Sequence, residues 1–229
     1  MANTITELFD RYYEEFLNKA KTFVENVLGG GYDYSIDELD SYIIDLYIKT
    51  FLMQAEELLV TLGIEFSEIE KRRIINSVDG SAFAIANHRR VKEILTNKVS
   101  YLQGLKDTYT VDGVFDRNAW TEHAISNMTG FIDAELQMTL EKSSVSSAKL
   151  IEDVFEVPIY KQWNSVLDKK TCMTCASMHG TRIRVTDSFM NHVPSGVSTS
   201  EVQDLLSYTG GDLAYAHPHC RCWFTYSTG

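Results

Sequence analysis

Proline, cysteine and tryptophan are scarce in this chain of 229 residues, which holds three, four and three of them. No proline occurs before Pro158, so no proline breaks a helix over the first two thirds of the chain. No apolar run approaches the roughly 18 residues that a membrane-spanning helix needs, and we therefore expect no such helix. No Ser-His-Asp order, glycine-rich phosphate loop or paired-carboxylate motif stands out either.

Positive charge is also in deficit, because the formal net charge is −11. Residues 1–80 carry 7 Lys and Arg against 16 Asp and Glu, whereas residues 81–229 carry 14 against 16. An acidic surface repels phosphate backbones, which argues against general nucleic-acid binding by the N-terminal part. A solvated acidic face and a docking face for a basic protein remain as alternatives.

The N-terminus has neither the basic region nor the apolar region of a secretory signal. We therefore expect the chain to fold in a reducing cytoplasm, where a cysteine cluster more often binds a metal than forms disulfides.

Residues 1–155 show apolar residues at helical spacing, with candidate capping boxes at Thr4–Glu7, Ser35–Glu38 and Ser67–Glu70. These signals predict three helices that end near Gly29–Gly31, Gly63 and Asp79–Gly80. A fourth helix is predicted over 81–105. After a polar link at 106–113, a fifth is predicted from near Asp116, to resume after the serine-rich residues 143–147. We interpret 1–155 as a helical domain.

The pattern changes near residue 156. Residues 157–167, 181–185 and 222–226 are typical of strands, and Ser198 with Glu201 could cap a short helix. All prolines and cysteines lie in this part. The predicted fold is therefore a mainly α-helical body, 1–155, with a small C-terminal α+β module, 156–229, which a zinc ion could staple.

The cysteines form two close pairs. Cys172 and Cys175 make a C-x-x-C motif, and Cys220 and Cys222 follow 45 and 47 residues after Cys175. Zinc takes four nitrogen or sulfur ligands, so the four cysteines could fill a structural site, or His217 could replace one of the last two. Cysteines without a metal, reduced or in disulfides, remain an alternative. A catalytic zinc is disfavoured because every strong donor would already be used.

The sequence around these pairs resembles the C-terminal region of the phage Mu F-like head morphogenesis family. The resemblance covers roughly residues 120–229. It is carried by Trp163, Asp168, Cys172, Cys175, Gly180, Phe189, His217, Pro218, Cys220, Arg221 and Cys222. One departure is the segment before the histidine, where the family often has further prolines.

The resemblance implies a minor capsid protein, present in few copies, that acts in head assembly without enzymatic activity. It implies the portal protein, the major capsid protein or both as partners, and a place in the virion after assembly in the host cytoplasm. The basic clusters at 71–73 and 88–90 favour solvated helix faces, with contact to packaged DNA or an acidic partner as the alternative.

Two other functions compete. An HNH-type nuclease would use His192 in "NHVPSG" as its general base, but no acidic residue directly precedes His192 and no C-x-x-C-H motif follows. A zinc-ribbon adaptor that binds a host protein would also contain a structural zinc, but it would not be part of a virion.

Overall fold

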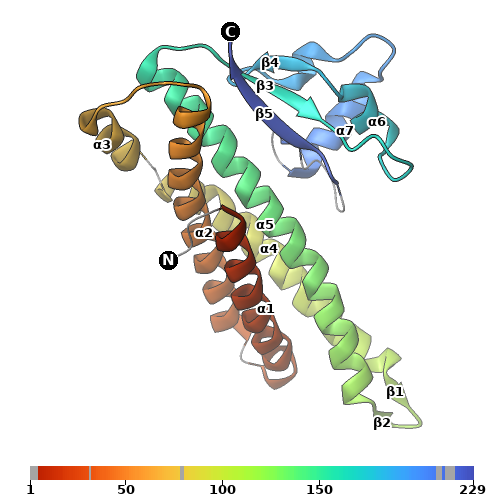
Figure 1. Cartoon of the computed structure of the whole chain (residues 1–229). Helices are drawn as coiled ribbons and strands as arrows, with labels where there is room; N and C mark the ends of the chain where they lie inside the picture. The colour runs from red at the N-terminus through yellow and green to blue at the C-terminus, as the bar shows by residue number, and fades with distance from the viewer. Residues whose placement is uncertain (1–4, 31, 78–79, 210–212, 215–219) are drawn as a thin grey trace. The chain divides into compact units, whose positions relative to one another are not determined.

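The computed structural model describes residues 5–30, 32–77, 80–209, 213–214 and 220–229. These residues are mainly helical and carry a small C-terminal sheet, as the sequence predicts (Figure 1). The chain divides into two compact units, Met1–Ile48 with Asp79–Leu136 and Lys49–Val78 with Gln137–Gly229. Helices α2, Tyr32–Thr61, and α5, Arg117–Phe155, each contribute to both units. Within the described ranges, no helix is both long and apolar enough to cross a membrane.

The first unit is a helical bundle of α1, Ile5–Gly29, α4, Gly80–Thr108, and the adjoining parts of α2 and α5. Apolar residues three or four apart give each helix one buried stripe. The largest side chains fully buried in this unit are Trp120, Phe16, Phe23, Ile36, Leu39, Ile43, Leu46 and Leu95. The indole nitrogen of Trp120 donates to the carbonyl of Leu102 at 2.9 Å, which satisfies its polar atom inside the core.

A short hairpin of β1, Thr110–Val111, and β2, Val114–Phe115, connects α4 to α5. Asp112 and Gly113 form its turn, both with positive φ, as a two-residue hairpin turn requires. The predicted polar link at 106–113 is thus the end of a helix followed by a hairpin.

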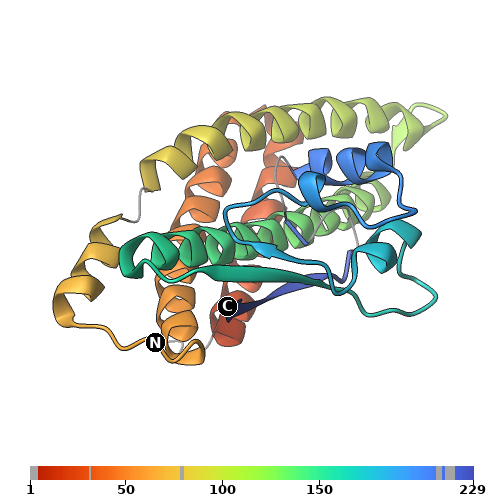
Figure 2. The same ribbon diagram turned by 90° about the horizontal axis from the view of Figure 1, so that it is seen from above.

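The second unit contains α3, Glu68–Ser77, and an antiparallel sheet in the order β4-β3-β5 (Figure 1). The central strand β3, Ile159–Asn164, pairs with β4, Arg182–Arg184, and with β5, Trp223–Thr228. Helices α6, Met173–Met178, and α7, Thr199–Thr209, are in contact with each other (Figures 1 and 2). Pairing of β3 with β5 therefore joins residues that lie 59 to 69 positions apart in the sequence.

Aromatic rings fill the core around the sheet. Trp163 on β3 meets Phe189 edge to face at 5.2 Å between centroids, and Phe189 stacks on Phe224 of β5 at 5.5 Å. Phe189 begins the 3-10 helix η1, Phe189–His192. The ammonium group of the buried Lys161 lies 5.1 Å from the Phe189 centroid, within reach of a cation–π interaction.

Three helix boundaries were predicted by capping boxes, with different outcomes. The Ser67–Glu70 box is confirmed, because Ser67 N donates to Glu70 at 2.7 Å and Glu70 N donates to the Ser67 hydroxyl at 3.3 Å. The Ser35 box is wrong: α2 begins at Tyr32, and the buried Ser35 hydroxyl accepts from Asn26 Nδ2 at 2.8 Å. Thr4 lies outside the described residues.

The predicted interruption of the fifth helix at 143–147 is also wrong, because α5 continues to Phe155. The hydroxyl of Ser143 donates to Leu140 O at 2.7 Å, and that of Ser147 donates to Ser143 O at 2.7 Å. Local bonds of this kind let serines remain inside a helix. The end of α5 coincides with the predicted change at 155/156, but the compact units are divided elsewhere, so the domain boundary stays a prediction.

Candidate metal centre

The first cysteine pair lies at the N-terminus of α6. Cys172 has an extended backbone and caps the helix, and its sulfur accepts from Cys175 N at 3.3 Å. Cys175 lies in the first turn of the helix and is 1% exposed. The C-x-x-C spacing therefore places both sulfurs at the start of one helix.

The second pair lies just before β5. Both Cys220 and Cys222 are buried. The thiol of Cys220 donates to Ala214 O at 3.3 Å, and the Cys222 sulfur lies 3.2 Å from the Ser165 hydroxyl. Because β5 pairs with β3 along its whole length, the register of the sheet holds this pair beside the end of β3.

The two pairs meet around one small cavity. The sulfurs of Cys175 and Cys220 are 3.9 Å apart, and those of Cys175, Cys220 and Cys222 all lie within 4.8 Å of one another. Cys172 joins them in lining a cavity of about 10 Å³, together with Lys170, Thr171 and Arg221. None of the four cysteines takes part in a disulfide.

The donor set fits zinc. A tetrahedral site with Zn–S bonds of about 2.3 Å separates its sulfurs by about 3.8 Å, close to the distance between Cys175 and Cys220. The cavity has room for one atom of about the size of a water molecule. The buried cysteines could therefore hold a metal ion, and the number and kind of ligands stay predictions.

The thiol environment favours protonated sulfur in the absence of a metal. Hydrogen bonds to Cys220 and Cys222, together with burial, raise the pKa of Cys175 far above its usual range. The hydrogen bond with Cys175 lowers the pKa of Cys222, but the bond with Cys220 and burial outweigh it and give about 11. A metal bound by these groups must displace their protons.

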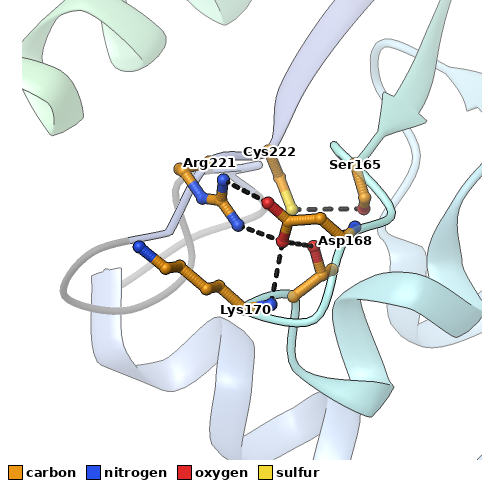
Figure 3. A network of polar contacts seen from close by, with 6 residues as sticks. Ser165, Asp168, Lys170, Arg221 and Cys222 are labelled. Carbon is orange, nitrogen blue, oxygen red and sulfur yellow. Dashed lines mark hydrogen bonds and ion pairs between the residues drawn. The ribbon is translucent and has the colours of Figure 1, made fainter.

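An ion pair connects the two halves of the cluster (Figure 3). Arg221, between Cys220 and Cys222, donates from Nη1 to Asp168 Oδ2 at 2.7 Å and from Nη2 to Asp168 Oδ1. The Asp168 carboxylate also accepts from Lys170 N at 2.8 Å. The hydrogen bonds from Arg221 and Lys170, with the Arg221 charge, hold the pKa of Asp168 well below its usual range.

Ser165 supports the cluster from the end of β3. Its hydroxyl donates to Cys175 O at 2.7 Å, and its backbone N donates to His179 Nδ1 at 3.0 Å. His179 is thus connected to Cys175 through Ser165.

All four cysteines line the same cavity, but only the sulfurs of Cys175, Cys220 and Cys222 lie within 4.8 Å of one another. A ligand set that includes Cys172 stays a prediction. His217 and Pro218 lie outside the described residues. Sequence reasoning missed Ser165 and the pairing of Asp168 with Arg221, although both members of that pair belong to the motif.

The proposed nuclease base lies apart from this group. His192 ends η1, and its Nε2 is 3.6 Å from Asp187 Oδ2, with both side chains nearly half exposed. In the described part of the chain, the side chains close enough to share a metal are Cys175, Cys220 and Cys222, without His192.

A comparison with protein families supports the resemblance read from the motif. Residues 115–225 match the family model described as Phage Mu protein F like protein. This part of the chain is therefore similar to the Mu F-like family. The match covers slightly less than half of the chain. It contains α5, all four cysteines, strands β3 and β4, and β5 as far as Thr225. No curated protein and no solved structure matches the chain.

Proposed function

We propose that the chain is a minor structural protein of a bacteriophage head, which assists head assembly, DNA packaging or DNA ejection. The observation that carries this proposal is the match of residues 115–225 to the Mu F-like family, because the matched segment contains the whole cysteine cluster. A phage family makes the head particle, assembled in the host cytoplasm, the natural location.

The cluster supports a structural rather than a catalytic role. Cys172, Cys175, Cys220 and Cys222 line a cavity with room for a single ion, so a zinc held by four sulfurs would keep no open position for a substrate. Such an ion would cross-link the N-terminus of α6 to the segment before β5. His217 remains the predicted alternative to one of the last two cysteines.

The partners follow from this location. We propose the portal protein, the major capsid protein or both as docking partners, with packaged DNA as a further contact. The acidic N-terminal residues 1–80 favour protein over DNA as the partner of that part, because like charges repel.

Quantitative mass spectrometry of purified phage heads tests the proposal. The chain should be present in a few copies per head and should remain after a high-salt wash. It should also bind purified portal or major capsid protein. Absence from heads, with the chain found only in the lysate, would exclude a virion role. Plasmid cleavage lost in His192→Ala would instead support a nuclease.

A further inference from the structure

The loop between β3 and α6 carries exposed apolar side chains. Val166 is 46% exposed, Leu167 is 54% exposed, and Met173, where α6 begins, is 86% exposed. In Figures 1 and 2 this segment extends beyond the end of the sheet before it returns to α6. Val166 and Leu167 are adjacent in the projecting loop, and Met173 begins the helix that follows it. Exposed large apolar residues in one such segment are candidates for an interaction surface.

Leu167 has a backbone conformation that a leucine rarely adopts. Its φ is 58°, in the left-handed region, where the Cβ of a bulky residue is strained and where glycine or asparagine is common. Strain of this kind persists where the surrounding structure enforces it, often at a binding surface. The leucine therefore exposes an apolar side chain to solvent at a position where its backbone is strained.

The loop is fixed in place by the groups that surround the cysteines. Asp168 accepts from Lys170 N at 2.8 Å, Thr171 N donates to Asp168 O at 3.0 Å, and Arg221 holds the carboxylate. Ser165, at the start of the loop, donates to Cys175 O. A surface ordered before binding loses less conformational entropy when a partner docks.

The charge of the loop is opposite to that of the chain as a whole. Lys169 and Lys170 are exposed and directly follow the apolar residues, whereas the one carboxylate, Asp168, is paired with Arg221. The loop is therefore locally basic in a chain whose net charge is −11. A partner surface complementary to this loop therefore has an apolar notch for the exposed side chains, with acidic residues around its rim.

We propose that Val166, Leu167 and Met173, flanked by Lys169 and Lys170, form a docking loop for an acidic, apolar-notched surface on a protein of the phage head. This inference rests on the proposed function and adds to it the surface and the chemistry of the partner. The cysteine cluster then has a purpose beyond stability, since it holds the docking loop in its binding conformation.

The test uses two variants of the full chain, Leu167→Gly and the charge reversal Lys169→Glu/Lys170→Glu. Each is produced in infected cells in place of the wild type, and its copies per purified head are counted. We expect incorporation to fall about tenfold or more for each. Purified portal and major capsid proteins serve as binding probes. Added salt should weaken binding of the wild type but not the residual binding of the charge reversal, because the acidic surface then repels the loop.

Leu167→Gly separates docking from folding. Glycine adopts a positive φ without strain, so the denaturation midpoint should stay the same or rise while incorporation falls. The matched control is Glu156→Gly. Glu156 also has a positive φ, 54°, but it lies outside the loop. It should be incorporated like the wild type.

The outcomes distinguish this inference from the proposed function. Wild-type protein in heads together with unchanged incorporation of both loop variants would overturn the docking loop and leave the head function intact. Absence of the wild type from heads would remove the head function and the docking loop with it. Loop variants that lose binding only to duplex DNA, or only to phosphatidylglycerol vesicles, would also overturn the inference, because the partner would not be a protein.

Discussion

Arg221 holds the two carboxylate oxygens of Asp168 with its two terminal nitrogens. Asp168 precedes the first cysteine pair by four residues, and Arg221 lies between the two cysteines of the second pair. The pair thus joins segments 53 residues apart at the rim of the cysteine cavity. Both side chains are about two-fifths exposed, so the pair acts through position more than through stability.

Arg221→Gln should expose the cysteines to reagents. Without the guanidinium, the turn at 168–171 loses its connection to the segment before β5, and local opening of the cluster becomes more frequent. Labelling of the metal-free protein with a disulfide reagent should become several-fold faster, measured from the absorbance of the released thiolate. Arg182→Gln is the control, because Arg182 bonds Ser227 and Thr228 at the edge of the sheet.

The double variant Arg221→Gln/Asp168→Asn tests whether the two residues act as a pair. If they do, it should label no faster than Arg221→Gln alone, because the contact is already lost. Additive rates would show that each residue protects the thiols independently, which contradicts a shared role.

The regular elements were accessible from the sequence because their signals are local. Apolar residues at helical spacing identified α1 and most of α4, and β-prone residues at 157–167 contain β3, Ile159–Asn164. The motif also identified the four cysteines that line the cavity. A C-x-x-C motif has a characteristic local geometry, which short-range patterns capture well.

What the sequence could not provide depends on contacts between distant segments. A capping box at Ser35 and a helix start at Tyr32 are equally compatible with the local sequence, and the burial of Ser35 beside Asn26 decides between them. Lys161 lies in a strand pattern that predicts no burial for a charged residue, yet it is buried against Phe189 and Phe224. The positive φ of Leu167 has no sequence signal at all.

Cys175→Ser and Cys220→Ser test the metal centre directly. If zinc is the bound metal, native mass spectrometry of the wild type should show one zinc per chain, and both variants should lose it. The thermal midpoint should fall by roughly 5 °C or more in each variant, and by a similar amount when a chelator removes the metal from the wild type. Comparing His217→Ala with Cys222→Ser identifies the fourth ligand.

Ser177→Ala is the control for these variants, since Ser177 lies exposed on the same short helix. It should retain the zinc and the wild-type midpoint. A chain that folds without metal, with a midpoint unaffected by the chelator, would contradict a structural zinc.

The hydrogen bonds of the Glu152 carboxylate predict that the folded protein loses stability in acid. Burial alone would raise its pKa, but hydrogen bonds from Arg184 and from Ile159 N, the latter at 2.7 Å, hold the pKa below its ordinary value. A depressed pKa stabilises the folded state fully above the unfolded pKa of about 4.3, and the stabilisation is lost as the pH falls through the folded pKa. Glu152→Gln should therefore cost about 1–2 kcal/mol at pH 7 and less below about pH 4.

Urea denaturation at several pH values measures this difference. The control is Asp153→Asn, which changes an exposed carboxylate on the same helix and should differ little from the wild type at every pH. A difference between wild type and Glu152→Gln that stays constant from pH 7 to pH 3 would show that Glu152 acts through its shape and not through its charge.

The first unit contains an ion pair between the partly exposed Arg90 and the buried Glu135, and loss of the arginine should be costly. Arg90 on α4 donates from Nη1 to Glu135 Oε1 at 2.7 Å, and Glu135, on α5, is 2% exposed. Arg90→Met would leave the carboxylate buried without its cation, which should lower the free energy of unfolding by about 3 kcal/mol. Urea denaturation at pH 7 measures this loss. Arg89→Met, a change at the exposed neighbouring residue, should shift it by no more than about 0.5 kcal/mol.

The double variant Arg90→Met/Glu135→Leu determines the origin of that loss. Much of the cost of Arg90→Met is the penalty for an uncompensated buried charge, so removing Glu135 as well should restore most of the lost stability. If the double variant is instead less stable than Arg90→Met, the two helices depend on the hydrogen bonds of the pair themselves. That result would make Arg90–Glu135 a stabilising contact of the bundle, and an apolar pair could not replace it.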